Sequence, residues 1–178
     1  MAAAIAAGAR IVNDISGLTG DARALPLVAR TGVAVVLMHM RGEPSTMQDD
    51  PRYDDVVRDV RDWLAERVAA CRDAGLSDDR IAVDPGIGFG KTVRHNVEIL
   101  AQLRTYATFG CALVIGASRK SFIGHLNRNE APKARLAGSI AAGLAALERG
   151  ASVLRVHDVG AMRQAITVWQ AINGGSGG

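Results

Sequence analysis

The segment RIAVDPGIGFGKT, residues 80–92, carries the clearest fold signal in the chain. An almost continuous apolar run, Arg80–Asp84, ends in a carboxylate, and a loop with three glycines follows it. Continuous rather than alternating apolar residues are typical of a parallel strand that is covered on both faces. The glycines allow the loop backbone to pass close to a ligand. The segment therefore predicts a buried parallel strand with a candidate binding residue, Asp84, at its carboxyl end.

Similar apolar runs recur on both sides of this segment and alternate with helical patterns. The other predicted strands are Arg10–Ile15, Ala34–His39, Ala112–Ala117 and Ser152–His157. Weaker helical patterns cover Ala22–Thr31, His95–Tyr106 and Ala161–Ile172, and Met1–Ala7 has the character of a helix end. Alternating strands and helices predict an α/β chain with a parallel sheet. This order alone leaves a barrel and a doubly wound sheet open.

Two helices have a strong apolar stripe. The first is predicted to begin at an N-cap residue, Asp54, and to end before Gly75. Its apolar face comprises Val56, Val60, Leu64, Val68 and Cys71, which recur at helical spacing. The second carries Leu136, Ile140, Leu144 and Leu147 and ends before Gly150.

Length and composition bound the kind of protein. The 178 residues suit one domain, predicted over residues 1–172, followed by a disordered glycine- and serine-rich tail over residues 173–178. The net charge of +3 comes without a run of like charges, so nucleic acid is not indicated as a partner. Cys71 and Cys111 cannot form a disulfide scaffold, and no Cys or His cluster predicts a metal site. Neither a membrane-spanning run of about 18 apolar residues nor a signal peptide is recognisable, so a cytoplasmic location is expected.

Polar side chains stand where each predicted strand ends. They are Asn13-Asp14, His39, Asp84, Ser118-Arg119-Lys120 and Arg155-Val156-His157-Asp158. In parallel α/β folds, ligands bind at the carboxyl ends of the strands. The Asp84 carboxylate can accept two parallel hydrogen bonds from a guanidine-like edge, although it can also simply cap a turn. The sequence Gly90-Lys91-Thr92 resembles the end of a P-loop, but Pro85 stands where that motif requires glycine.

Two of these strand ends contain cations. Arg119 and Lys120 stand at the expected start of a helix, where positive charge opposes the helix dipole. They are therefore expected to meet something negative, either a ligand or a neighbouring carboxylate. Arg155 and His157 are two residues apart, so they share one face of a strand that is expected to be buried. Because unpaired buried cations are costly, the two are predicted to bind a phosphate-like anion or to form a salt bridge with a strand-end Asp.

Five segments together resemble the dihydropteroate synthase family. They are Ile11–Ile15, Leu37–Met40, Asp84–Lys91, Gly116–Ser121 and Arg155–Val159, in this order along the chain. The resemblance implies a (β/α)₈ TIM barrel. It also implies a transferase of folate biosynthesis that joins 6-hydroxymethyl-7,8-dihydropterin diphosphate to 4-aminobenzoate, forming 7,8-dihydropteroate and releasing diphosphate.

The resemblance also implies roles for individual residues. Asn13, Asp84 and Lys120 would hold the pterin ring, and Asp84 and Lys120 would take part in catalysis. The remaining substrate-binding residues would be Met38, Phe89 and Gly116 at the pterin and aminobenzoate pockets, Ser121 near the aminobenzoate carboxylate, and Arg155 and His157 at the diphosphate. Magnesium is expected as a cofactor, but the family's asparagine ligand for it has no counterpart in this sequence.

The family's first three barrel strands also have no counterpart in the sequence. The chain is therefore expected to form an incomplete barrel that corresponds to strands 4 to 8, and to be inactive, or nearly so, on its own. One alternative is a non-catalytic module of this family that binds pterin or another protein. Another is the pterin-binding domain of a corrinoid methyltransferase, against which the Ser-Arg-Lys-Ser and Arg-Val-His blocks argue. A homodimer, as in the family, is a further expectation.

Overall fold

The structure, a computed structural model, describes residues 1–43 and 46–174. Its centre is a parallel sheet of five strands in the order β1-β2-β3-β4-β5. The strands are β1 (Ile11–Asp14), β2 (Ala34–Met38), β3 (Ile81–Asp84), β4 (Ala112–Ile115) and β5 (Val153–Leu154). All the predicted strands are therefore present. Their sequential order agrees with a barrel, because the strand order of a doubly wound sheet reverses at a switch point.

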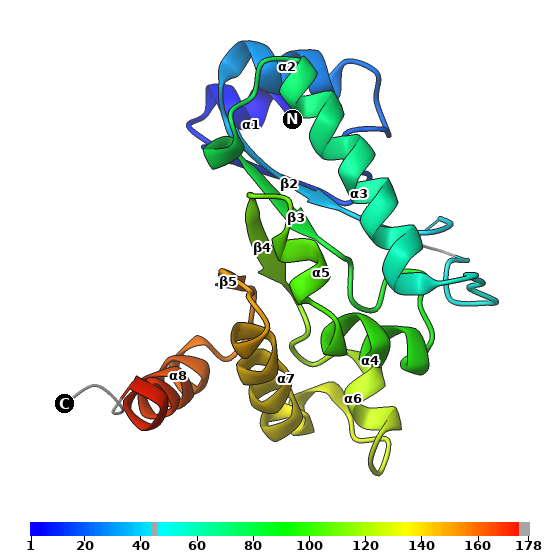
Figure 1. Cartoon of the computed structure of the whole chain (residues 1–178), viewed down its shortest axis with the longest axis vertical. Helices are drawn as coiled ribbons and strands as arrows, with labels where there is room; N and C mark the ends of the chain where they lie inside the picture. The colour runs from blue at the N-terminus through cyan, green and yellow to red at the C-terminus, as the bar shows by residue number, and fades with distance from the viewer. Residues whose placement is uncertain (44–45, 175–178) are drawn as a thin grey trace.

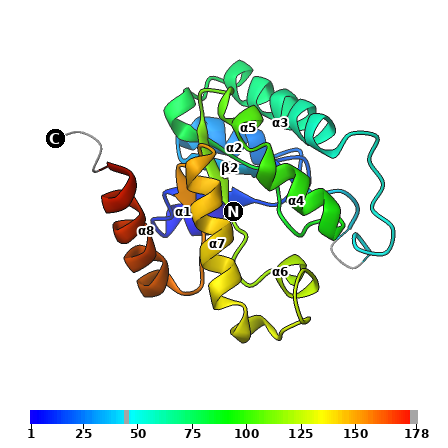
Figure 2. The same cartoon turned by 60° about the horizontal axis from the view of Figure 1, so that its bottom comes forward.

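Helices follow every strand and lie along the sheet in chain order, from the blue α2 to the red α8 (Figure 1). Helix α1 (Ala2–Ala6) precedes the sheet. The others are α2 (Ala24–Thr31), α3 (Val56–Asp73), α4 (Val93–Ala101), α5 (Arg104–Ala107), α6 (Ser121–His125), α7 (Leu136–Glu148) and α8 (Val159–Gly174), with short 3₁₀ turns at Asp78–Arg80 and Pro132–Ala134. The last two helices, α7 and α8, lie side by side in both views (Figures 1 and 2).

The two faces of the sheet differ in burial. Val35, Leu37 and Val83 are completely buried in the core that the helices form with the sheet. On the other face, Ile11 of β1 and Val153 of β5 remain 63% and 47% exposed. In the described part of the chain, each of these outer strands has a sheet neighbour on one side only. The chain is thus an incomplete barrel, because the inner face of a barrel is filled only when the ring closes.

Element boundaries differ from the predictions, most clearly in three places. The predicted helix His95–Tyr106 is two helices, α4 and α5, because the turn after Ala101 buries Leu103 and Tyr106. The predicted strand Ser152–His157 is reduced to Val153–Leu154, because the following side chains turn toward neighbouring strand ends. Residues 173 and 174, predicted as the start of the tail, are the end of α8, and residues 175–178 lie outside the described residues.

Two expectations about cysteines and membranes can be compared with the described residues. Cys71 and Cys111 are free and buried, and burial raises the pKa of both thiols, so they stay protonated and unreactive.

Within residues 1–43 and 46–174, no helix combines the length and apolar character that crossing a membrane requires.

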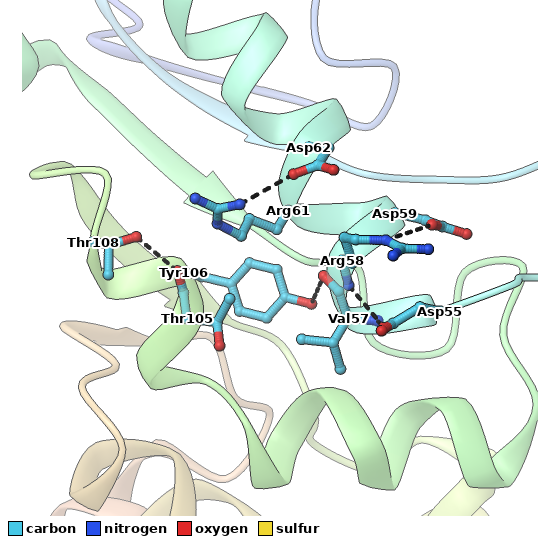
Figure 3. A network of polar contacts seen from close by, with 9 residues as sticks. All are labelled: Asp55, Val57, Arg58, Asp59, Arg61, Asp62, Thr105, Tyr106 and Thr108. Carbon is cyan, nitrogen blue, oxygen red and sulfur yellow. Dashed lines mark hydrogen bonds and ion pairs between the residues drawn. The ribbon is translucent and has the colours of Figure 1, made fainter.

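The N-terminus of α3 is capped by Asp55, not by Asp54 as predicted. The Asp55 carboxylate accepts hydrogen bonds from the backbone N–H groups of Val57 and Arg58, at 3.1 and 3.0 Å (Figure 3). The buried Tyr106 of α5 donates its hydroxyl to the Val57 carbonyl oxygen at 3.2 Å. Helix periodicity could not choose between two adjacent aspartates, because it locates a helix end only to within one or two residues.

Replacing Asp55 by alanine is expected to lower the free energy of unfolding by about 1 kcal/mol, the usual value of an N-cap side chain. Asp54→Ala is the matched control, since Asp54 is exposed and does not cap the helix; its change should stay within about 0.5 kcal/mol. Urea unfolding of the two variants measures both values. Equal losses, or a larger loss for Asp54→Ala, would contradict the assignment of the cap.

Candidate active site

Asp84, the last residue of β3, is the centre of the polar strand ends. Its side chain is 1% exposed. One carboxylate oxygen accepts a hydrogen bond from the Gly86 N–H at 2.8 Å, and the other accepts one from Arg155 Nη2 at 3.2 Å. Burial raises the pKa of Asp84, while the Gly86 hydrogen bond and the charges of Arg155, Lys91 and Lys120 oppose that rise. The site therefore contains one buried carboxylate among several cations.

Lys120, the residue before α6, extends over the loop that follows β3. Its Nζ lies 4.0 Å from the centroid of the Phe89 ring, a cation–π distance. Its stem packs beside Gly88, where an added Cβ would lie 3.0 Å from Lys120 Cδ. Burial and the Arg155 charge lower the pKa of Lys120, and Asp84 opposes this. The structure thus places Lys120 against the Phe89 ring and close enough to Asp84 for the two charges to interact.

Gly116 leaves the space through which Arg155 reaches Asp84. A Cβ at Gly116 would lie 2.7 Å from Arg155 Nη2, so a larger residue would displace the guanidinium. The Arg155 side chain is 43% exposed, and Val153 beside it is exposed as well. The prediction that Arg155 sits in a buried strand is wrong, because β5 has a single neighbouring strand in the described chain. The salt bridge to a strand-end Asp, one of the two readings of this cation, is confirmed.

His157 is fixed by Ser118 and does not share the partner of Arg155. The His157 ring Nδ1 lies 3.1 Å from Ser118 Oγ, and its backbone N–H donates to the same oxygen at 3.3 Å. Ser118 is 5% exposed, so this contact is anchored in the core. The imidazole therefore has a defined orientation at the end of β5.

Arg119 meets a neighbouring carboxylate, one of the two outcomes expected for it. Its Nε and Nη2 donate to the two Asp158 carboxylate oxygens at 3.0 and 2.6 Å. Its backbone N–H donates to Ser139 Oγ at 2.9 Å, and its φ angle of 59° is unusual for a residue other than glycine. The bidentate ion pair ties the strand end that carries Lys120 to the one that carries His157.

Three other candidates, on β1, β2 and α6, make no hydrogen bond to Asp84 in the part of the chain that is described. Asn13 is exposed on β1 and pairs in register with Val36. Met38 is completely buried and stands opposite Asp84 in the register of β2 and β3. Ser121 is exposed at the first turn of α6. Their roles at a ligand stay predictions.

Two polar residues in the site were not singled out from the sequence. Lys91, at the end of the glycine loop, is 3% exposed. Asn96 of α4 accepts a hydrogen bond from the Gly88 N–H at 2.7 Å and donates one to the Thr92 carbonyl oxygen at 2.8 Å. Apart from its place in the family-like segment Asp84–Lys91, Lys91 stood out only as the end of a P-loop-like sequence, and a lysine or asparagine beside a glycine loop usually faces solvent. The helical spacing of Asn96 and the buried Ile99 was the available signal.

Across residues 1–43 and 46–174, no group of three or more His, Cys, Asp or Glu side chains is arranged to hold a metal ion. No catalytic step is therefore assigned to magnesium from this chain's own residues.

Comparison with known proteins decides the family. A family model described as pterin binding enzyme matches residues 1–157. The chain belongs to this family. Relatives within it include the dihydropteroate synthase of Escherichia coli K12, which is 44% identical over 164 residues and 92% of this chain. Solved structures of dihydropteroate synthases are also similar: that of Xanthomonas albilineans with 4-aminobenzoic acid (48% identity, TM-score 0.90, 97% of this chain) and that of Burkholderia cenocepacia with 7,8-dihydropteroate (46%, 0.90, 98%).

The chain spans 57% of the Escherichia coli protein, 60% of the Xanthomonas chain and 64% of the Burkholderia chain. These coverages fit the prediction that the sequence corresponds to a portion of a dihydropteroate synthase with an incomplete pterin-binding barrel. The resemblance to the family is thus confirmed. The roles of individual residues within this pterin-binding fold stay predictions.

Proposed function

We propose that the chain provides the pterin- and diphosphate-binding part of a dihydropteroate synthase. The substrates would be 6-hydroxymethyl-7,8-dihydropterin diphosphate and 4-aminobenzoate, and the products 7,8-dihydropteroate and diphosphate. The observation that carries this proposal is the hydrogen bond between Asp84 and Arg155, because it joins a buried carboxylate suited to a pterin edge to a half-exposed cation suited to a diphosphate. The ligands of the Xanthomonas and Burkholderia structures, a substrate and the product of this reaction, add support.

In this proposal, Asp84 orients the pterin. Its carboxylate accepts hydrogen bonds from the ring N–H and the exocyclic amino group, and its negative charge favours the positive charge that develops on the pterin methylene. Lys120 and Phe89 form one wall of the ring pocket, and Asn13 and Met38 contribute from the neighbouring strands.

Arg155 and His157 hold the diphosphate. As the methylene C–O bond breaks, its electron pair leaves with diphosphate, and the Arg155 guanidinium and the His157 ring stabilise the departing charge. The amine nitrogen of 4-aminobenzoate forms the new C–N bond and loses a proton to water. Ser121 lies near the aminobenzoate carboxylate, and Gly116 leaves the space that Arg155 occupies. The protein contributes positioning and charge, not a covalent intermediate.

The variant Arg155→Met should separate the contribution of the diphosphate to binding from that of the pterin ring. We expect affinity for the dihydropterin diphosphate to fall about 10- to 100-fold, because a hydrogen-bonded charge is lost. Affinity for 6-hydroxymethyl-7,8-dihydropterin, which lacks the diphosphate, should change much less. Arg163→Met on the exposed surface of α8 is the matched control. Calorimetric titration measures each affinity, and an equal loss for both ligands would contradict the role of Arg155.

The 178 residues by themselves are expected to form dihydropteroate very slowly or not at all. The inner face of the sheet is open at Ile11 and Val153, so water reaches the face on which substrates would be held. The assay combines the purified chain with magnesium and both substrates and measures the dihydropteroate formed. Turnover comparable to that of the Escherichia coli relative would refute this prediction.

Three further expectations rest on the family resemblance alone. They are a homodimer, a cytoplasmic location and the use of magnesium, and each stays a prediction. A non-catalytic pterin-binding module stays the alternative; it would also bind pterin, and any dihydropteroate formed in the turnover assay would exclude it.

A further inference from the structure

Lys91 joins two strand ends beneath the candidate site. Its Nζ donates to the Phe89 carbonyl oxygen at 2.9 Å and lies 3.0 Å from His39 Nδ1 and 3.5 Å from the His39 carbonyl oxygen. His39 directly follows β2, whereas Phe89 belongs to the loop after β3. At 3% exposure, the ammonium group is enclosed by the protein rather than by water. Because a buried cation is costly, we expect its position to serve the groups that it contacts.

The loop is packed tightly around this lysine. A Cβ at Gly86 would overlap the His39 carbonyl oxygen and would lie 3.5 Å from Lys91 Nζ. Gly86 is also the residue whose N–H binds the Asp84 carboxylate. Lys91 Nζ therefore lies beside the turn that holds Asp84.

The charges around Lys91 are mostly of its own sign. Seven charged or titratable residues of the described chain lie around it. They are His39 and Arg41 after β2, Tyr53 before α3, Asp84 of β3, His95 of α4, Lys120 before α6 and Arg155 after β5. The acidic member of this set is Asp84. Burial lowers the pKa of Lys91 to about 7, and the Asp84 charge opposes this. Burial and the charge of Lys91 lower the pKa of His39 to about 3, so its ring is neutral.

We propose that Lys91 is a positioning residue for Asp84: it ties His39 to Phe89 beneath the loop and supplies a buried positive charge that keeps the Asp84 carboxylate ionised. Only an ionised carboxylate can accept two hydrogen bonds from a pterin edge. This inference rests on the proposed function for the identity of the ligand. The ionisation of Asp84 itself is a property of the free chain and can be measured without a ligand.

The test is a pH titration of the Asp84 carboxyl carbon by NMR in the wild-type chain and in Lys91→Met, which keeps the length of the side chain but not its charge. The resonance is assigned by its absence in Asp84→Asn. Removing a nearby positive charge disfavours the carboxylate, so the midpoint should rise by about one pH unit or more. Lys133→Met, at an exposed lysine in the 3₁₀ turn after α6, should leave it unchanged. An unchanged midpoint in a folded Lys91→Met chain would overturn the proposal. Lys91 would then only connect His39 to Phe89 and have no effect on the ionisation of Asp84.

A second reading in the wild-type chain covers the case in which Lys91→Met does not fold. Because coupled groups sense each other's titration, the Asp84 carbon should show a further inflection where Lys91 loses its proton, near pH 7. A single inflection would overturn the proposal.

Pterin affinity adds a readout that separates this inference from the proposed function. Lys91→Met should bind pterin more weakly than wild type at a pH near the midpoint of its own Asp84 titration, and nearly equally well above both midpoints, where Asp84 is ionised in both chains. A constant loss at every pH would indicate a purely structural role and count against the inference. If the wild-type chain bound no pterin, the proposed function would fail, and the carbon titration would still decide the role of Lys91.

Discussion

Asp84→Asn should reduce the affinity of the chain for a dihydropterin about 100-fold. The asparagine amide has nearly the same shape, but it can accept hydrogen bonds through one atom only and places a donor against the ligand's donors. Hydrogen bonds to charged groups contribute about 1.5–3 kcal/mol, and about 2.7 kcal/mol corresponds to a factor of 100. Quenching of pterin fluorescence on binding measures the ratio of the two dissociation constants.

The variant is expected to stay folded. Burial already disfavours the ionised form of Asp84, so the loss of that buried charge removes an unfavourable contribution. Circular dichroism checks this before the titration. Asp73→Asn, at the exposed end of α3, is the matched control and should bind like the wild-type chain. Affinities of Asp84→Asn and wild type that agree within a factor of about three (about 0.7 kcal/mol) would remove Asp84 from the binding site.

Gly86→Ala should destabilise the whole chain by about 3 kcal/mol or more. Gly86 has a φ angle of 70°, in the left-handed region, where a residue with a Cβ loses about 1–2 kcal/mol. The added Cβ would also overlap the His39 carbonyl oxygen, a backbone atom that can move only with β2. Overpacking of this kind adds about 1–3 kcal/mol.

Gly32→Ala separates these two contributions. Gly32 ends α2 with a φ angle of 66°, almost the same as that of Gly86, but nothing lies within 4 Å of its added Cβ. Its substitution should therefore cost about 1 kcal/mol from backbone strain alone. Urea unfolding of both variants gives the difference. If Gly32→Ala and Gly86→Ala lost equal stability, the close approach of the β3 loop to His39 would be wrong.

The strands could be predicted from the sequence because parallel strands that are covered by helices have short continuous apolar runs. The same reasoning overestimated the length of β5. Its apolar run continues through Val156, but β4, its neighbour in the sheet, ends at Ile115. The pairing of Arg155 with Asp84 links residues 71 positions apart, so local periodicity could offer it only as one of two readings. The fold decides between them by placing the carboxyl ends of β3 and β5 around one centre.

Lys91 marks the limit of what sequence patterns revealed about the site. A lysine after a glycine-rich loop has the composition of a solvent-exposed turn, and its burial depends on close approaches at Gly86 and Gly90 that no local pattern encodes. Asp55 was missed as the N-cap because helical periodicity does not distinguish two adjacent aspartates. In contrast, Asp84 and Lys120 were candidates because they stand at or after predicted strand ends, and Phe89 was a candidate through the family resemblance.

Calorimetric titration of the folded 178-residue chain with 6-hydroxymethyl-7,8-dihydropterin diphosphate tests the pterin-binding assignment most directly. We predict saturable binding of one ligand per chain, with part of the affinity lost when the diphosphate is absent and most of it lost in Asp84→Asn. A chain that is folded by circular dichroism and yet takes up no heat from this ligand at any pH from about 6 to about 8 would contradict the assignment.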